Sequence, residues 1–505
     1  MITAVGSQIP GLYRNTKTFT VKECVPGDHL NISSPVAGNC MKSISIFIQE
    51  RLAKINEGES FPDIIKYWLP EVISSMILLT LPPMIDSYII SNSQTMNSYG
   101  ALAMAVNFLY TLTKFAEAIP VAAMAVIGRY NGAKDYEKCG ESLGSTFWLT
   151  VLLGALQFVI IFIAATAIYR WMGVPEEMVA LGAPFLRLKS LGIFLVFTLL
   201  GFIGFMRGIK NTTMPMYINI AGIATFIFFD IALVLGKWGF PTLSLHGSAL
   251  ATILQYGVMN AIAILYIIFN PEYKKYFKQV FFSICNYREI LKIASLSWPI
   301  IIDKTSFALS YVWLAKMIAG MGTYAITTYD VVKNLERFAF IPAVAFAQVV
   351  TFLVSNRLGS NDPDGASANI KKILMLSIGS VSLCLIVMSW NATYLVSFFD
   401  PRGNFTAFAA TVFPLISMLV IFDLIQVTLA GALRGAGDVR AVMWTRFLVT
   451  IFLFGPAAYL VNLLPIDNMV LKFSLVYGTY YLSNGTMAFI FLHRALSHKW
   501  QKTKI

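Results

Sequence analysis

Apolar runs long enough to cross a lipid bilayer recur along most of the chain, and this feature limits the possible fold more than any other. A transmembrane helix needs about 20 mostly apolar residues. Charged side chains make up only 13% of the sequence, well below the share in soluble domains. The sequence therefore predicts an all-α integral membrane protein. We place its twelve transmembrane helices at 64–91, 98–127, 141–169, 178–206, 214–236, 244–270, 295–318, 322–355, 370–399, 406–433, 440–463 and 467–493.

The distribution of basic residues predicts the orientation of these helices. Lys and Arg gather in the N-terminal arm, the C-terminal tail and alternate connections, while the other connections hold only Arg170, Lys237 and Arg402. Because basic loops stay in the cytoplasm, both termini are predicted to be cytoplasmic. The net charge of +12 is then explained by topology, and no nucleic acid partner is expected. With no eukaryotic sorting signal in the sequence, we expect a multi-pass protein of a bacterial inner membrane.

An internal repeat divides the helices into two sets of six. Phe205–Gly208 resembles Ala432–Gly435, and Arg129–Asp135 resembles Asn356–Asp362, both at a sequence offset of 227. Since six is an even number, both copies enter the membrane from the same side, which predicts two lobes related by an axis along the membrane normal. The predicted parts are a partly disordered cytoplasmic arm at 1–62, an N-lobe at 63–270, a basic linker at 271–294, a C-lobe at 295–493 and a basic tail at 494–505.

The doubled Arg-Gly motif also indicates a family. Met206–Pro215 followed by Asp230, and Asp423–Val427 leading into Ala430–Gly435, resemble the paired motifs of the multidrug and toxic compound extrusion (MATE) family, with a NorM-like tenth helix. The resemblance covers about 64–495. It implies a monomeric exporter that moves small organic compounds out of the cell in exchange for H⁺ or Na⁺, by alternating access of two lobes. Membrane lipid and the organic substrate would be its partners, and no further cofactor is expected.

Three helices of the N-lobe carry candidate coupling residues at one depth. Asp86, Asp230 and Thr252 all lie roughly 8–12 Å from the predicted outer surface, and Ser248 shares the helix face of Thr252. Oxygen ligands of this kind can hold Na⁺, and a desolvated carboxylate can carry a coupling proton. The MATE resemblance implies the same layout for a cation site. Phe226 stands where many relatives have an asparagine ligand, which favours H⁺ over Na⁺. Alternatively, the two acids are simply hydrogen-bonded within the lobe.

The C-lobe offers a second candidate acid. Asp423 lies in the NorM-like motif, and the resemblance implies a C-lobe cation site there. The acid that the family has on the seventh helix is missing, since Ala308 occupies its expected position. Asp303 shares the depth of Asp423 and would allow a rearranged site, although its neighbour Lys304 also fits a simple interfacial pair.

Polar clusters on the second and eighth helices predict a substrate cleft. Charged groups at the middle of a membrane helix must face protein or water. The spacings of Lys114 and Glu117, and of Asp330 and Lys333, also permit pairs along one helix that only neutralise each other. Because the bases balance the acids, an anionic or zwitterionic substrate is a live hypothesis. The predicted cleft residues are Asn107, Lys114, Glu117, Asp330, Lys333, Asn334, Glu336 and Arg337.

Other function classes find little support in the sequence. No G-x-S-x-G, Walker A or H-E-x-x-H motif is present, so the chain is not expected to be an enzyme, and export must be secondary. Dispersed histidines and cysteines predict no metal site beyond a possible Na⁺ at Asp86 and Asp230. The alternatives are a flippase for a lipid-linked glycan precursor, a membrane-bound transferase and a channel. Arg207 and Arg434 are interpreted as interfacial arginines at tight turns.

Overall fold

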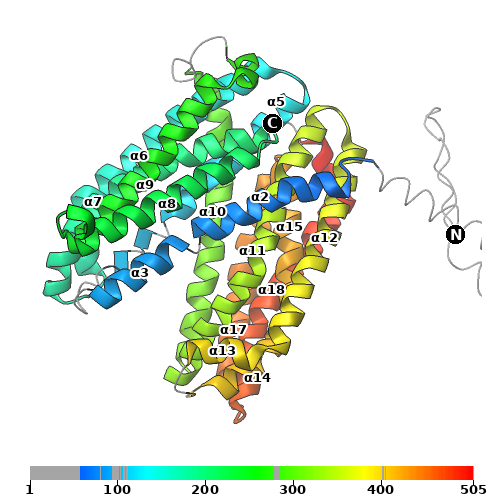
Figure 1. Cartoon of the computed structure of the whole chain (residues 1–505). Helices are drawn as coiled ribbons and strands as arrows, with labels where there is room; N and C mark the ends of the chain where they lie inside the picture. The colour runs from blue at the N-terminus through cyan, green and yellow to red at the C-terminus, as the bar shows by residue number, and fades with distance from the viewer. Residues whose placement is uncertain are drawn as a thin grey trace, which may run out of the picture. The chain divides into compact units, whose positions relative to one another are not determined.

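A computed structural model describes residues 57–79, 81–93, 102, 104–105, 108–109, 112–277, 285–400, 403 and 405–503. In these residues the regular structure is helical (Figure 1). The first half of the chain forms α2 (Phe61–Leu79), α3 (Leu81–Ser93), α5 (Ala118–Gly132), α6 (Tyr136–Trp171), α7 (Glu176–Gly208), α8 (Thr213–Leu235), α9 (Ser244–Phe269) and the short 3₁₀ helix η3 (Pro271–Tyr276).

The second half repeats this arrangement. Its helices are α10 (Tyr287–Ala319), α11 (Thr323–Gly359), α12 (Pro363–Trp390), α13 (Ala392–Phe399), α14 (Thr406–Ser417), α15 (Val420–Gly435), α16 (Val439–Leu448), the π-helical turn η5 (Val449–Phe454), α17 (Gly455–Leu463) and α18 (Met469–Leu496). In Figure 1, α6 to α9 are grouped on the left and α10 to α18 on the right.

Eleven of the twelve predicted spans coincide with a described helix or with successive helices, and the span 98–127 overlaps α5 but lies partly outside the described residues, so the predicted all-α fold class is confirmed. Seven of the described helices are long and apolar enough to cross a membrane, and the pair α14 and α15, bent by 47°, adds an eighth. The sequence repeat reappears in the helix ends, because α5 and α11 end at the equivalent positions Gly132 and Gly359. The next helix begins each time after an aspartate, Asp135 or Asp362, that accepts a backbone hydrogen bond at its N-terminus.

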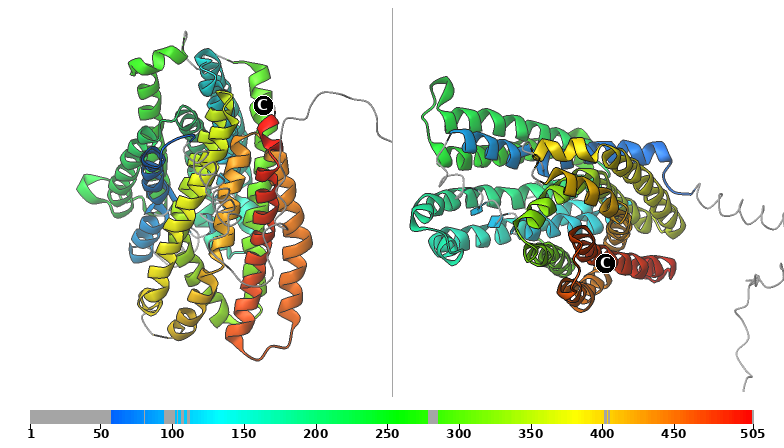
Figure 2. Two further views of the ribbon diagram at one scale, coloured as in Figure 1. Left: turned by 90° about the vertical axis from the view of Figure 1, so that its right-hand side faces the viewer. Right: turned by 90° about the horizontal axis from the view of Figure 1, so that it is seen from below.

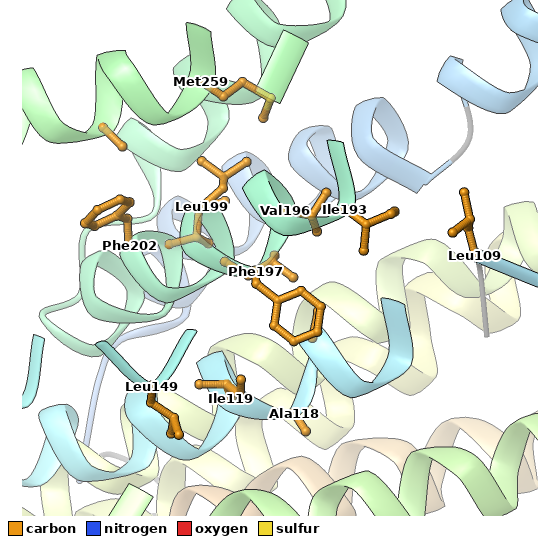
Figure 3. Close-up of a cluster of buried hydrophobic side chains, with 14 of the residues drawn as sticks. Leu109, Ala118, Ile119, Leu149, Ile193, Val196, Phe197, Leu199, Phe202 and Met259 are labelled. Atoms are coloured by element: carbon orange, nitrogen blue, oxygen red, sulfur yellow. The ribbon is translucent and has the colours of Figure 1, made fainter. Parts of the chain in front are cut away.

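Each lobe has its own apolar core. In the N-lobe, Ile119 of α5, Leu149 of α6, Phe197 and Phe202 of α7, and Met259 of α9 pack together (Figure 3). The C-lobe core contains the buried rings of Phe413, Phe473 and Tyr477 and is built largely from α10, α11, α14 and α18. Since burial of apolar surface is the main favourable term in packing within a lobe, each lobe can act as one unit.

A third apolar cluster joins the two lobes. It contains Ile64 of α2 and Met124 of α5 from the N-lobe, and Phe346, Val350 and other residues of the C-lobe. The Trp68 ring of α2 stacks on Phe346 at 4.8 Å, and its indole N–H donates to the carbonyl of Pro342. Helix α2 therefore packs along α11 of the other lobe as well as along α8 of its own (Figures 1 and 2).

Candidate functional site

The two predicted N-lobe acids lie on different helices that meet in the folded lobe. Asp86 belongs to α3 and Asp230 to α8, and both are buried, at 3% and 0% exposure. Ile85, Phe226 and Ala251 form one small apolar cluster, which brings α3, α8 and α9 together beside the acids. Asp230 is within electrostatic range of Asp86 and of Lys189. The structure thus unites two carboxylates that lie far apart in the sequence.

The carboxylate of Asp230 has no hydrogen-bond partner among the described residues. Both of its oxygens are buried without a donor, and so is Oδ1 of Asp86. Burying a charged carboxylate without a partner is strongly unfavourable, so such a group either binds a cation or takes up a proton. Both carboxylate oxygens of Asp230 are therefore available to a proton or a cation.

The sequence did not reveal that a lysine completes this site. Lys189 of α7 donates to Oδ2 of Asp86 at 3.1 Å, and its side chain is only 10% exposed. The two residues are 103 positions apart in sequence, so no local spacing could pair them. With Lys189 present, the site holds two carboxylates and one ammonium group. One positive charge is therefore already bound to Asp86.

The two predicted hydroxyl ligands lie on α9 and are both buried. The Thr252 hydroxyl donates to the backbone carbonyl of Ser248 at 2.9 Å, while the Ser248 hydroxyl has no partner among the described residues. Phe226 is 2% exposed and places an apolar ring on the turn before Asp230. The turn of α8 before Asp230 therefore offers no side-chain oxygen, whereas Ca²⁺, a hard cation, takes six or more oxygen ligands.

In the C-lobe, Asp423 belongs to a buried chain of hydrogen bonds. Its Oδ1 accepts from the side-chain amide of Gln426 at 2.9 Å, and the oxygen of that amide accepts from Arg446 at 2.8 Å. Arg446 also donates from Nε to Oδ1 of Asp303 at 2.5 Å, and Arg434 binds the other oxygen of Asp303. Asp303 and Asp423 thus share one network, in which Asp303 is held by two arginines.

The predicted cleft residues occupy different environments. Glu336 is 7% exposed and accepts hydrogen bonds from the hydroxyls of Tyr477 and Tyr481, at 2.5 and 2.8 Å, inside the C-lobe core. Asp330 accepts from Asn334 at 3.2 Å and lies 3.9 Å from Lys333, as the helical spacing predicts. Arg337 is exposed on the same helix. Asn107 lies outside the described residues.

Glu117 pairs with two lysines, one of which links the lobes. Its oxygens contact Lys114 at 2.6 Å and Lys304 at 2.8 Å. Lys114 was predicted from the sequence spacing, whereas Lys304 comes from α10 of the C-lobe. The three side chains retain 15–25% exposure and carry a net positive charge. This charged group is therefore partly accessible at a contact between the lobes.

Both arginines of the Arg-Gly motif pair with an acid on the first helix of their own lobe. Arg207 donates from Nε and Nη2 to the two oxygens of Glu71, at 2.8 and 2.6 Å, and Glu71 has 0% exposure. Arg434 pairs with Asp303 of α10 through Nη2 alone. The interpretation of these residues as interfacial arginines at turns is thus incomplete, because each one also ties the end of its helix to α2 or α10.

The lobes contact each other closely at the end of the bundle that carries the loops 132–135, 208–212, 359–362 and 435–438, which we call the basic end. Here α5 and α11 cross at their last turns. The amide of Asn356 donates to the carbonyl of Gly208 at 2.9 Å, and Arg129 donates to the carbonyl of Ala436 at 2.8 Å. The Arg-Gly loop of each lobe is therefore bound by the helix end of the other.

Comparison with known proteins decides the family. A sequence model of the MatE family matches residues 72–231 and again residues 299–460, so the two matched segments begin at equivalent positions of the internal repeat. The chain belongs to the MatE family. The double match agrees with the duplicated motifs, and the family's two-lobe architecture agrees with the described helices.

Curated relatives and solved structures agree with this assignment. The chain is 25% identical over 331 residues to the probable multidrug resistance protein YoeA of Bacillus subtilis, covering 63% of this chain and 72% of YoeA. It is 21% identical over 394 residues to the multidrug resistance protein MdtK of Edwardsiella ictaluri, covering 78% and 86% of the two chains. Its fold resembles an outward-facing MATE family transporter, with a TM-score of 0.76 at 17% identity, over 87% of this chain and 96% of the other.

Proposed function

We propose that this MatE-family protein is a secondary active exporter that moves organic compounds out of the cell in exchange for protons. The observation that carries the proposal is the buried carboxylate of Asp230, whose two oxygens have no partner among the described residues. A carboxylate of this kind is stable when protonated or when it holds a cation. The curated relatives named as multidrug resistance proteins support export as the direction of transport.

Two features favour the proton over Na⁺ as the coupling ion. The Lys189 ammonium group already neutralises Asp86. An apolar ring stands at Phe226, so this position of α8 offers no oxygen ligand. Protonation of Asp230 needs no further ligands, whereas Na⁺ requires several oxygens. The proposed coupling site then consists of Asp86, Asp230, Ser248, Thr252 and Lys189. Asp423 is a second candidate acid, connected through Gln426 and Arg446 to Asp303.

The inter-lobe contacts indicate how coupling would work. In the structure the lobes are joined at the basic end, which the positive-inside rule assigns to the cytoplasm of a bacterial cell. Alternating access requires these contacts to break and the opposite ends of the lobes to meet. A proton at Asp230 that binds with different free energy in the two states shifts the equilibrium between them.

The charged group at Glu117 suggests which substrates the protein accepts. Lys114 and Lys304 outnumber the one carboxylate between them, and both lobes contribute. An organic anion or zwitterion would gain from this arrangement, whereas an organic cation would be repelled. Removal of Lys304 should therefore weaken export of anions more than export of cations.

Efflux from liposomes tests the proposed function. Liposomes that contain the purified protein are loaded with a fluorescent anion, zwitterion or cation, and an inward gradient of H⁺ or of Na⁺ is imposed separately. Efflux driven by H⁺ that is lost in Asp230→Asn and kept in Asp364→Asn, an exposed acid in the first turn of α12, would support the proposal. Efflux driven by Na⁺ alone would overturn proton coupling. No movement of any compound under either gradient would overturn export and favour a lipid-linked glycan as cargo.

A further inference from the structure

A cavity of about 390 Å³ opens at the basic end, away from the coupling site. It is lined by four cationic side chains, Lys134, Lys210, Lys275 and Arg357. Lys134 and Lys210 come from the N-lobe, Lys275 from η3 in the linker, and Arg357 from α11 of the C-lobe. Two tyrosines, Tyr136 and Tyr276, complete the wall, with the ammonium group of Lys275 about 5 Å from both rings. The cavity therefore concentrates positive charge between the lobes.

Only part of this charge is neutralised by the protein. Glu59 contacts Lys210 at 2.8 Å and Arg357 at 3.1 Å, and Asp362 contacts Arg357 at 2.8 Å. Within the described part of the chain, no carboxylate forms an ion pair with Lys134 or Lys275. Two positive charges are thus available to a ligand. Clustered lysines and arginines that outnumber the nearby acids are typical of phosphate recognition.

The backbone gives an independent indication of function. Lys134 and Lys210 adopt left-handed conformations, with φ of 61° and 66°. The equivalent residues of the C-lobe repeat are Asn361 and Gly437, which adopt the same conformation with φ of 57° and 83°. Glycine and asparagine tolerate this conformation, whereas a lysine is unfavourable in it. The N-lobe copy thus places lysine at both positions where the fold prefers glycine or asparagine, and both of these lysines line the cavity.

A residue in an unfavourable backbone conformation lowers the stability of the fold. Such a residue persists where its side chain has a function. We propose that the cavity is a binding site for a phosphate-bearing anion, either free phosphate or the headgroup of an anionic lipid in the cytoplasmic leaflet. The anion contacts Lys134 of the N-lobe and Lys275 of the linker, and reaches Arg357 of the C-lobe. Bound in this position it joins the lobes and stabilises the state that is closed at the basic end. This inference is separate from the proposed coupling ion and cargo.

The thermal unfolding of the full-length protein, followed by tryptophan fluorescence, tests this site. One arm compares sodium phosphate with sodium chloride at equal ionic strength in detergent. The other compares nanodiscs of phosphatidylglycerol with nanodiscs of phosphatidylcholine. Phosphate that raises the melting temperature in a saturable way identifies the free anion, and a shift in phosphatidylglycerol alone identifies the lipid headgroup. Either shift supports the site, provided that the variants below remove it.

Two variants and a control separate a binding site from a structural role. Lys134→Asn should melt at a higher temperature than the wild type without phosphate, because asparagine suits the backbone, yet should respond less to the anion. Adding Lys275→Gln should raise the half-saturating concentration by about tenfold or more, as expected for the loss of charge-assisted hydrogen bonds. Lys274→Gln, on the same turn but outside the cavity lining, should respond as the wild type does. The proposal is overturned if neither phosphate nor phosphatidylglycerol raises the melting temperature of the wild type. It is also overturned if the melting temperature of the double variant rises as much as that of the wild type.

Discussion

Gly132 and Gly359 pack against each other's helices in a reciprocal way. A Cβ atom on Gly132 would overlap the backbone carbonyl oxygen of Asn356, and a Cβ on Gly359 would overlap that of Arg129. The two glycines are equivalent in the sequence repeat, as are Arg129 and Asn356. The pseudo-twofold axis of the repeat therefore passes between the last turns of α5 and α11, where the absence of side chains lets the two backbones touch.

This crossing predicts a sensitivity to small side chains. Gly132→Ala should lower the stability of the closed basic end by about 1–3 kcal/mol, because the backbone of α11 must move away. Gly257→Ala in α9 is the matched control, since a Cβ at Gly257 meets no atom within 4 Å. Alanine in a helix is otherwise more favourable than glycine, so the control should keep or gain stability. Equal melting temperatures for the two variants in detergent would contradict a close crossing.

The ion pair of Arg207 and Glu71 should contribute strongly to the stability of the N-lobe. Arg207→Gln leaves the fully buried Glu71 carboxylate without its partner, for which we expect a loss of about 3–5 kcal/mol. Glu71→Gln in the same chain should restore part of that loss, and a double-mutant cycle measures the coupling. Arg170→Gln breaks an exposed pair with Glu176 and should cost less than about 1 kcal/mol. Similar losses for Arg170→Gln and Arg207→Gln would contradict this role.

Asp303 and Asp423 should behave differently when their charge is removed. Asp303→Asn leaves Arg434 and Arg446 in buried surroundings without a carboxylate, so the variant should be strongly destabilised or fail to fold. Asp423→Asn can still accept a hydrogen bond from Gln426, so it should fold normally. Melting temperatures of the purified variants check this difference. A stable Asp303→Asn variant with altered ion dependence of transport would instead make Asp303 part of the coupling machinery.

The ion pairs of Glu59 should make the stability of the basic end depend on pH. Burial raises the pKa of the Glu59 carboxyl, but Lys210 and hydrogen bonds from Asn369 and Arg357 outweigh burial, so the pKa lies below its ordinary value of 4.5. A lowered pKa stabilises the folded state at neutral pH, and this stabilisation is lost as the pH falls through the folded-state pKa. The melting temperature should therefore fall less steeply below pH 4.5 in Glu59→Gln than in the wild type. Glu57→Gln, an exposed neighbour, serves as control, and parallel pH profiles for all three proteins would contradict the prediction.

The helices and the repeat could be predicted from the sequence, but the partners of the charged residues could not. Apolar runs and the constant offset between the repeated motifs are local or periodic signals, so the twelve spans and the two lobes could be predicted. Asp86 and Asp230 were found because their depths match. Lys189 was missed as a partner because its side chain meets Asp86 only after α3 and α7 have both packed on α9, and no motif records this packing.

The N-terminal arm shows a similar limit. The predicted arm at 1–62 includes Glu59, and the structure binds this residue to Asn369 and Lys210. Gly58, with φ of 82°, packs directly against Asn369, and the Lys372 ammonium group contacts the carbonyls of Glu57 and Glu59. The contacts with Asn369 and Lys372 join segments from opposite halves of the chain. Composition alone shows a polar segment there and cannot reveal the surface to which it binds.

Proton release on substrate binding is the sharpest test of proton coupling at Asp230. If substrate and proton favour opposite states of the protein, adding a transported compound to purified protein in weakly buffered detergent should release protons, seen with a pH-indicator dye. We expect release from the wild type and from Asp364→Asn, and none from Asp230→Asn, although the last variant should remain folded. Undiminished release from Asp230→Asn, or no release from the wild type with a compound that it transports, would contradict proton coupling at Asp230.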